Sequence, residues 1–236
     1  MRQFCFAPVA ALAALLSLAP GAPVRAEPAV VVELFTSQGC YSCPPADEVL
    51  GQLAEYDHIV ALAMHVDYWD YLGWRDTFAQ KTFTKRQFDY RDYAGARVVY
   101  TPQMIVQGTK PVTGSRAMSV KEAISQAEGR PVSAEVEIVA KDGALMAIVS
   151  PVVAGGSGVL FVASYIRQRT VEIARGENGG KRLTYHNIVD GLRDMGPWSG
   201  DRAEISLPMP EPGHGIALWL QEDGHGPILA AAKFER

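Results

Sequence analysis

The chain has 236 residues, of which 48% are hydrophobic and 20% are charged, a composition typical of a globular protein that buries a substantial core. Its 22 basic and 26 acidic residues give a formal net charge of −4. Because proteins that bind nucleic acid or anionic membrane surfaces normally carry basic blocks, this charge argues against both kinds of partner.

The first 26 residues have the pattern of a signal peptide. Arg2 precedes an apolar run from Phe4 to about Leu18, and the segment ends in the small-x-small sequence VRA at residues 24–26. The run is shorter than the ~20 residues that a transmembrane helix needs, which favours cleavage over a retained anchor. We therefore expect a periplasmic or secreted protein with no membrane span after cleavage.

Cleavage would leave Cys40 and Cys43 as the cysteines of the mature chain, because Cys5 lies in the signal segment. A structural disulfide framework normally has several spaced pairs, and a four-cysteine zinc site would need a second C-x-x-C. The pair is therefore either a redox pair or part of a mixed-ligand metal site.

The residues around this pair predict a βαβ unit. Residues 29–35, AVVVELF, form a valine-rich apolar run typical of a strand buried on both faces. Pro44 and Pro45 suit the first turn of a helix, and helical apolar spacing continues to Ala54. Residues 58–66 then predict a second buried strand, joined by a right-handed crossover.

The rest of the chain divides near the GRPVS sequence at residues 129–133. Before it, residues 67–97 predict a polar-aromatic helical insertion, and residues 98–129 predict two short strands and an amphipathic helix. After it, alternating hydrophobicity predicts about seven strands, which suggests a β-sandwich. We expect a signal peptide at 1–26, one domain at 27–130 and a β-rich domain at 131–236.

The position of the cysteines suggests their roles. A thiolate is the attacking species in disulfide exchange, and free amides and the helix dipole at a helix N-terminus lower the pKa of a cysteine there. Cys40 follows the first strand and a glycine turn, so it is the predicted nucleophile. Cys43, about one helical turn later, is predicted to be more buried and to resolve a mixed disulfide.

Thr101 and Pro102 precede the strand QMIVQG. At this point the chain resembles the thioredoxin superfamily, in which a cis-proline loop faces the C-x-x-C. The resemblance implies that Pro102 and Thr101 position a substrate strand. The alternative is an ordinary trans proline that enters an edge strand.

Glu33 is the only charge in the AVVVELF run. Resemblance to periplasmic thioredoxin-like oxidoreductases implies a buried acid near this place, which would relay the proton of Cys43. The alternative is a half-buried glutamate on an edge strand, since lone carboxylates usually avoid full burial.

Polar and aromatic side chains cluster after the second predicted strand. His65, Asp67 and Asp70 lie at its C-terminal end, where ligands of parallel sheets bind. His65 would tune the thiolate, bind a metal, or simply pack. Asp67 and the nearby aromatic residues would line a substrate groove or belong to the core: Tyr68, Trp69, Tyr71 and Trp74.

Longer stretches resemble one family more closely: ELFTSQGCYSCPPAD, HVDYWDYLGW, YTPQMIVQG and GENGGKRLTYHN. They are similar to a family of secreted bacterial thioredoxin-like proteins classed as a domain of unknown function. The resemblance implies an α/β fold, with a thioredoxin-like N-terminal domain that carries a helical insertion, followed by a mainly β, sandwich-like domain. The last stretch is expected to be a hairpin tip; alternatively, it contacts the cysteine site through Asn178 or His186.

The favoured function is an exported thiol–disulfide oxidoreductase that acts on protein or peptide thiols. It needs no organic cofactor but does need an electron-transfer partner, and its direction is left open. One alternative is a protein that binds or delivers copper or zinc through Cys40, Cys43 and His65. The other is a non-enzymatic binding module in which the cysteine pair is a fixed disulfide.

Overall fold

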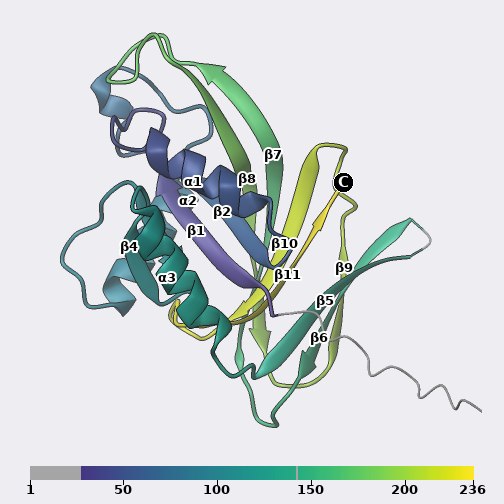
Figure 1. Cartoon of the computed structure of the whole chain (residues 1–236). Helices are drawn as coiled ribbons and strands as arrows, with labels where there is room; N and C mark the ends of the chain where they lie inside the picture. Colours follow the sequence, from purple (N-terminus) through teal and green to yellow (C-terminus); the bar gives the residue numbers. More distant parts are fainter. Residues whose placement is uncertain (1–27, 142) are drawn as a thin grey trace, which may run out of the picture.

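The structure is a computed structural model that describes residues 28–141 and 143–236 (Figure 1). The expected signal peptide lies outside the described residues. Within them, no helix combines the length and the apolar character needed to cross a membrane.

The first part of the chain forms the predicted βαβ unit and a hairpin. The buried strand β1 (Val30–Thr36) leads to α1 (Pro44–Ala54), and β2 (Ile59–His65) pairs with β1 in parallel. On the other side of β1, β3 (Gln103–Val106) pairs antiparallel with both β1 and β4 (Lys110–Thr113). The strand order β2-β1-β3-β4 is that of the expected thioredoxin-like unit.

Helices cover both faces of these strands. The predicted insertion contains the short 3-10 helix η1 (Asp70–Leu72) and α2 (Lys81–Tyr93), and α3 (Ala117–Glu128) follows β4. α1 and α3 pack on the face that carries Val32 and Leu34. Phe83 and Tyr90 of α2 pack on the opposite face. Each face of β1 therefore has its own hydrophobic core, as expected for a strand buried on both sides.

The remaining chain supplies the seven strands that the alternating pattern predicted. Three of them form a small antiparallel sheet: β5 (Ala134–Lys141), β6 (Ala144–Pro151) and β9 (Ala203–Leu207). The other four belong to the large sheet: β7 (Gly158–Glu172), β8 (Arg182–Trp198), β10 (His214–Gln221) and β11 (Ile228–Glu235).

The thioredoxin-like unit and the β-rich part share one eight-stranded sheet, in the order β11-β10-β7-β8-β2-β1-β3-β4. At the junction, Ala63 of β2 pairs with Ile188 of β8, and the side-chain amide of Asn187 donates to the carbonyl of Ala61 at 3.0 Å. The expected boundary near residue 130 thus lies between α3 and β5 along the chain, but it does not separate two sheets.

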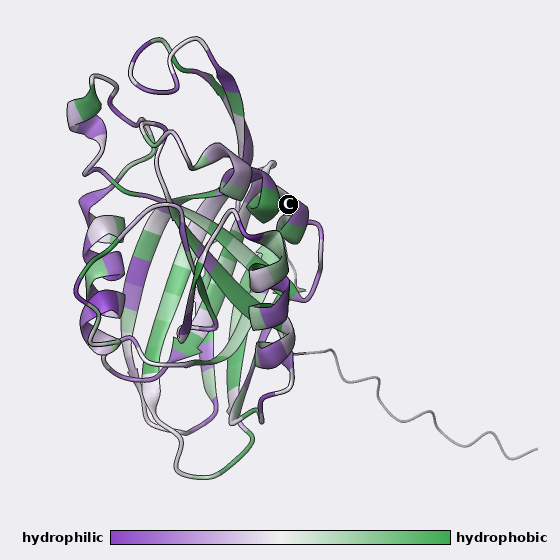
Figure 2. Ribbon diagram, turned by 60° about the vertical axis from the view of Figure 1, so that its left-hand side comes forward, coloured by the Kyte–Doolittle hydropathy of each residue, from purple (hydrophilic) through white to green (hydrophobic). Residues whose placement is uncertain are grey.

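The sandwich-like part arises where the small sheet packs against β7, β10 and β11. Leu145 of β6, Trp198 of β8 and Leu218 of β10 meet in the core between the two layers. Figure 2 shows the hydrophobic residues concentrated along the strands and the hydrophilic residues on the outer faces of the helices.

Candidate functional site

Cys40 and Cys43 form a disulfide at the N-terminus of α1, with their Cα atoms 5.4 Å apart. Cys43 is the N-cap residue of the helix, and Cys40 ends the turn that follows β1. Cys40 keeps 3% of its surface exposed, whereas Cys43 is fully buried. Cys43 is therefore the more buried of the two cysteines, as predicted from the sequence.

The Thr101–Pro102 loop lies beside Cys40. The peptide bond between Thr101 and Pro102 is cis, as the resemblance implies. The Thr101 hydroxyl donates to Cys40 Sγ at 3.2 Å, and the indole Nε1 of Trp69 donates to Thr101 Oγ1 at 2.7 Å. Because an indole N–H only donates, the Thr101 oxygen accepts there and its own proton is available to the sulfur.

The first turn of α1 offers fewer amide donors than we predicted. Pro44 and Pro45 have no N–H group, the amide of Cys43 donates to the carbonyl of Cys40, and that of Ala46 donates to the carbonyl of Cys43. Residues 43–46 therefore supply no free amide to Cys40 Sγ. Two hydroxyl groups can donate to Cys40 Sγ. One is that of Thr101, and the other is that of Ser42, whose oxygen lies 3.5 Å from the sulfur.

Glu33 is on the face of β1 that points away from α1. Side chains alternate along a strand, so Glu33 lies with Val31 and Phe35 on the side covered by α2. It is fully buried, and its carboxylate accepts from Arg86 Nε at 2.5 Å and from Arg86 Nη2 at 3.1 Å. It also accepts from Tyr90 Oη.

This placement differs from both interpretations of Glu33. β1 is an inner strand, so Glu33 is not at a sheet edge. Its carboxylate is committed to Arg86, on the opposite side of the sheet from the helix that Cys43 caps. Burial is tolerated because the charge is paired and hydrogen-bonded.

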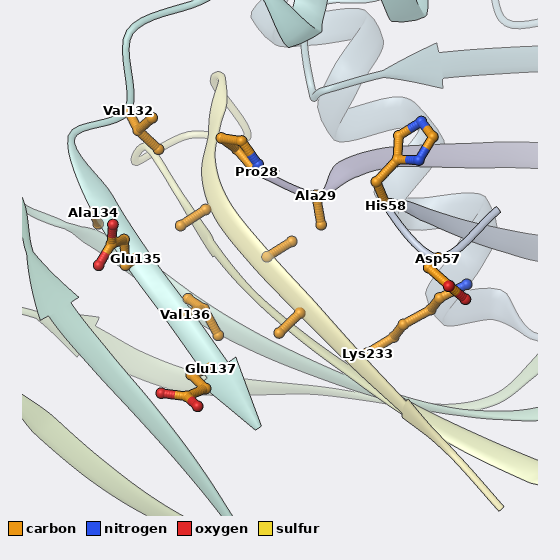
Figure 3. A pocket seen from close by; sticks show the side chains of 13 residues that line it. Pro28, Ala29, Asp57, His58, Val132, Ala134, Glu135, Val136, Glu137 and Lys233 are labelled. Carbon is orange, nitrogen blue, oxygen red and sulfur yellow. The ribbon is translucent and has the colours of Figure 1, made fainter. Parts of the chain in front are cut away.

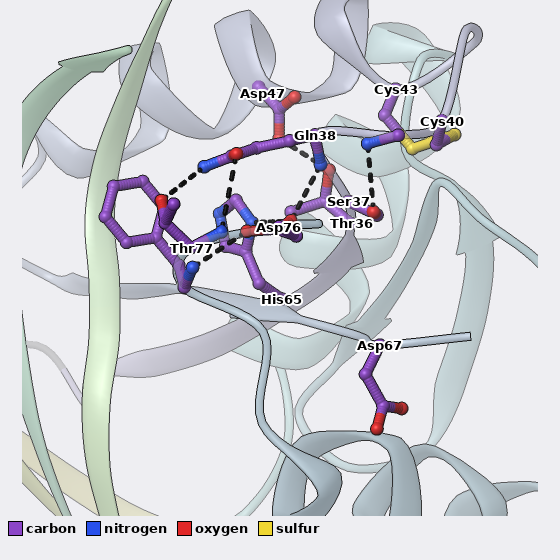
Figure 4. A network of polar contacts seen from close by, with 12 residues as sticks. Thr36, Ser37, Gln38, Cys40, Cys43, Asp47, His65, Asp67, Asp76 and Thr77 are labelled. Carbon is purple, nitrogen blue, oxygen red and sulfur yellow. Dashed lines mark hydrogen bonds and ion pairs between the residues drawn. A yellow bond between two sulfur atoms is a disulfide. The ribbon is translucent and has the colours of Figure 1, made fainter. Parts of the chain in front are cut away.

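The buried acid on the α1 side of the sheet is Asp47, one helical turn after Cys43 (Figure 4). Asp47 accepts a hydrogen bond from the Thr36 hydroxyl at 2.8 Å. His65, at the end of β2, makes a contact of 2.7 Å from its Nδ1 to Asp76 Oδ2. The backbone amide of Gln38, in the turn before Cys40, also donates to Asp76 Oδ2, at 2.7 Å. A buried polar cluster thus underlies the cysteine turn.

The surroundings of this cluster raise the pKa values of Asp47 and His65 and lower that of Asp76. Burial raises the pKa of Asp47 from 3.8 to about 7, against the opposing effects of the His65 charge and the Thr36 hydrogen bond. Burial acts to lower the pKa of His65, but the charge and hydrogen bond of Asp76 outweigh it and the net shift is upward. The pKa of Asp76 is lowered, because the His65 charge and backbone amides outweigh its burial.

Three polar atoms of this cluster have no hydrogen-bond partner among the described residues: Asp47 Oδ2, His65 Nε2 and Tyr185 Oη. The Tyr185 ring, on β8, packs edge-on against His65 with the ring centroids 5.0 Å apart. Buried polar atoms are almost always satisfied, so unpaired ones are common at places that exchange protons or hold water. Asp47, whose backbone amide donates to the carbonyl of Cys43 at 3.1 Å, is therefore a buried carboxyl with a raised pKa one helical turn from Cys43.

The predicted substrate residues have different positions. Trp69 reaches the surroundings of the disulfide through Thr101, and Trp74 Nε1 donates to Gln38 Oε1, in the turn before Cys40, at 2.8 Å. Asp67 accepts from the Thr84 hydroxyl of α2 at 2.7 Å, and Figure 4 shows its carboxylate pointing away from the cysteines. Tyr68 donates to Gln87 of α2 at 3.1 Å. These two hydrogen bonds attach the start of the insertion to its helix α2, and the Tyr68 hydroxyl also interacts with Thr101, beside Cys40.

Exposed aromatic rings flank the cysteines. Tyr41, between the two cysteines, is 65% exposed, and Tyr71 is 76% exposed. Tyr71 stacks on Trp69 with the ring centroids 6.3 Å apart. Amphipathic aromatic side chains of this kind are enriched where proteins bind one another.

The hairpin that joins β7 and β8 reaches the cysteine turn, as the alternative interpretation of GENGGKRLTYHN expected. Asn178 Nδ2 donates to the carbonyls of Gln38 at 3.0 Å and Cys40 at 2.9 Å. His186, the other residue considered, packs instead against Gly51 of α1. The β-rich part of the chain therefore contributes to the site through Asn178.

The alternative metal site would use His65 with both cysteines. In the structure the cysteines are joined to each other and His65 Nδ1 faces Asp76. Across residues 28–141 and 143–236, no group of three or more histidine, cysteine, aspartate or glutamate side chains is arranged to hold a metal ion.

A separate cavity of about 490 Å³ lies between the start of β1, β5 and β11 (Figure 3). Its floor is apolar and includes Ala231 and Val136, and Lys233 and Glu137 are among its polar lining residues. Pro28 and Ala29, which precede β1, also line it, whereas the cysteines follow β1. The cavity is therefore at the opposite end of the strand from the disulfide.

Sequence reasoning missed Asp47, Asp76 and Tyr185. An acidic residue in the first turn of a helix usually complements the helix dipole, so Asp47 gave no distinct signal. Asp76 is one of several acids in the polar insertion. The useful signal was the alternation in β2, which places His65 on the same face as Ala61 and Ala63, below α1.

The comparisons with known proteins identify the family. The chain matches the model of a protein of unknown function, DUF1223, over residues 31–221, and it belongs to this family. No curated protein matches it. The crystal structure of protein AGR_C_4864 from Agrobacterium tumefaciens is similar, with 31% identity, a TM-score of 0.74, and coverage of 87% of this chain and 93% of that one.

A second solved structure is similar in fold alone. HBP35 of Porphyromonas gingivalis aligns with a TM-score of 0.58 at 13% identity, over 89% of this chain and 75% of that one. The family membership agrees with the predicted class to the extent that this is a family of unknown function. Together, the family match and the structure establish a disulfide-bonded C-x-x-C pair in a member of the DUF1223 family.

Proposed function

We propose that this protein is an exported thiol–disulfide oxidoreductase whose redox pair is Cys40 and Cys43 and whose substrates are protein or peptide thiols. The observation that carries this proposal is the disulfide at the start of α1 with the Thr101 hydroxyl 3.2 Å from Cys40 Sγ. Export is supported by the signal-peptide pattern of residues 1–26.

In the oxidising direction, a substrate thiolate attacks Cys40 Sγ. The substrate–Cys40 bond forms, the Cys40–Cys43 bond breaks, and Cys43 leaves as a thiolate. Because Cys43 is fully buried, its charge is costly there. Asp47, with a pKa of about 7, is protonated in a large fraction of molecules at neutral pH and donates its proton to Cys43.

A second substrate thiolate then attacks the substrate sulfur of the mixed disulfide. The substrate gains a disulfide, and Cys40 is released as a thiolate that accepts hydrogen bonds from Thr101 and Ser42. Two electrons have moved from the substrate to the cysteine pair. An electron-transfer partner must reoxidise the pair, and the same residues perform the reverse sequence on a substrate disulfide.

Trapping of mixed disulfides tests the proposal. A full-length Cys43→Ser protein should accumulate protein partners on Cys40, because the resolving thiol is absent. Partners are identified by mass spectrometry after alkylation in the compartment that holds the chain. The matched control is Cys40→Ser, in which the buried Cys43 should capture nothing. If Cys40 stays reactive to a thiol probe but captures no protein, the substrate class is wrong.

A further inference from the structure

The tip of the β7–β8 hairpin, residues 173–181, is held in one conformation by its own backbone hydrogen bonds. Ile173 and Lys181 close it with a backbone hydrogen bond of 2.9 Å, and Gly180 donates to the Ile173 carbonyl at 2.7 Å. Gly176 and Gly180 have φ values of +75° and +81°, a region that glycine adopts without strain. The tip therefore has a defined shape with which to contact its neighbours.

Asn178 is buried at the centre of this exposed tip. It retains 1% of its surface, and its amide protons go to the carbonyls of Gln38 and Cys40. Its side-chain oxygen accepts from Lys181 Nζ at 2.8 Å, which fixes the orientation of the amide. The side chain thus bridges two carbonyls of the cysteine turn, on either side of Gly39.

Further contacts place the tip against the same turn. Glu177 Oε2 accepts from the backbone amide of Tyr41 at 3.3 Å, and Lys181 Nζ lies 4.8 Å from the centre of the Tyr41 ring. A Cβ added at Gly176 would be 3.2 Å from Trp74 Cβ, so the tip also approaches the insertion closely. The turn from Gln38 to Tyr41 is therefore held from outside by residues more than 130 positions later in the chain.

We propose that Asn178 is a positioning residue for the redox pair: by holding the carbonyls of Gln38 and Cys40, it keeps the two cysteines close together and favours their disulfide. The Cys40 carbonyl also accepts from the amide of Cys43, so Asn178 acts on an atom that belongs to the turn between the cysteines. A turn that is already ordered loses less conformational entropy when the two thiols join, which raises their effective concentration.

This role rests on the proposed function in that it assigns Asn178 to the same cysteine pair, yet it is measured without a protein substrate. The probe is glutathione: the protein dithiol and one oxidised glutathione give the protein disulfide and two reduced glutathiones. Two electrons and two protons pass from the cysteines to glutathione. The fraction of oxidised protein is measured by alkylation over a series of glutathione ratios.

We expect Asn178→Ala to lower the equilibrium constant for disulfide formation about tenfold, equivalent to a potential about 30 mV less negative for this two-electron couple. Asn178→Asp should lower it at least as much, because it replaces the donor with an oxygen that repels both carbonyls. The matched control is Thr184→Ala, which removes an exposed hydroxyl contact of 2.9 Å with Thr170 in the same hairpin. It should stay within about twofold of the native constant, because that contact does not touch the cysteine turn.

Native constants in both Asn178 variants would overturn the proposal, even if their melting temperatures fall. Failure of both variants to fold would also contradict it, since Asn178 would then be a residue of general stability. A protein that captures no protein thiols, yet shows the tenfold shift in Asn178→Ala, would contradict the proposed function and leave the role of Asn178 intact.

Discussion

At the scale of single residues, two of the buried acids near the cysteines, Glu33 and Asp47, differ in their partners. Glu33 is neutralised by Arg86 and hydrogen-bonded to Tyr90. Asp47 has one oxygen bonded to Thr36 and one without a partner among the described residues. A carboxyl that is buried but unpaired holds its proton to a higher pH than one paired with a cation. Asp47 is therefore the residue to which we attribute the proton transfer in the proposed function.

Replacement of Asp47 should change the pH dependence of reduction. Asp47→Asn removes the proton donor, so reduction of the disulfide by dithiothreitol should slow about 10²-fold at pH 6. The difference should shrink above pH 7, where Asp47 of the native protein has lost its proton. Glu55→Gln, at the exposed C-terminal end of α1, is the control. Parallel pH profiles for the native protein and Asp47→Asn would contradict the assignment.

The free energy of unfolding should also vary with pH because of Asp47. The pKa of Asp47 is raised on folding, so between about pH 4 and pH 7 the folded state binds more protons than the unfolded state. This contribution to stability is complete below pH 4 and is lost as the pH rises to about 7, with a slope of at most about 1.4 kcal/mol per pH unit. Asp47→Asn should flatten that part of the curve measured by urea unfolding.

At the scale of elements, Arg86 of α2 joins β1 to the strands that follow residue 130. It pairs with Glu33 of β1, donates to Gln221 of β10 at 2.9 Å, and lies 4.9 Å from the centre of the Phe161 ring of β7. A buried charge of this kind is stable only while its partners remain. The pair therefore holds β1, α2 and the later strands together.

Replacing one member of the Glu33–Arg86 pair should show that the pair stabilises the fold. Glu33→Gln leaves Arg86 buried with its charge uncompensated, so the free energy of unfolding should fall by about 3–5 kcal/mol. The double variant Glu33→Leu with Arg86→Leu should lose less, because no buried charge is left unpaired. The pH profile of disulfide reduction should stay native in both. A shifted profile with native stability would instead return the proton-relay role to Glu33.

The elements that the sequence could predict are those with a strong local period. β1, β2 and α1 lie where the valine run, the apolar run and the Pro44–Pro45 signal place them. β7 and β8 are long, with 15 and 17 residues, and the tip of their hairpin reaches the cysteine turn. Alternation indicates a strand but not what its end contacts, so the contact of Asn178 remained one of two alternatives.

At the scale of the whole molecule, the large sheet explains how distant segments reach one site. β8 pairs beside β2, which brings Tyr185 to His65 and the hairpin tip to the turn that contains Cys40. The sequence correctly indicates seven C-terminal strands, but no local pattern says that four of them extend the first sheet. Strand order depends on non-local pairing, which is why only the structure reveals the shared sheet.

The reduction potential of the Cys40–Cys43 pair tests the central claim most directly. It follows from the glutathione equilibrium of the unmodified protein, measured by alkylation of free thiols. A pair that exchanges with protein thiols should have a potential between about −270 and −120 mV, the range of thiol–disulfide oxidoreductases. A value below about −300 mV would contradict the account, since it is typical of a permanent structural bridge and would favour a binding module with a fixed disulfide.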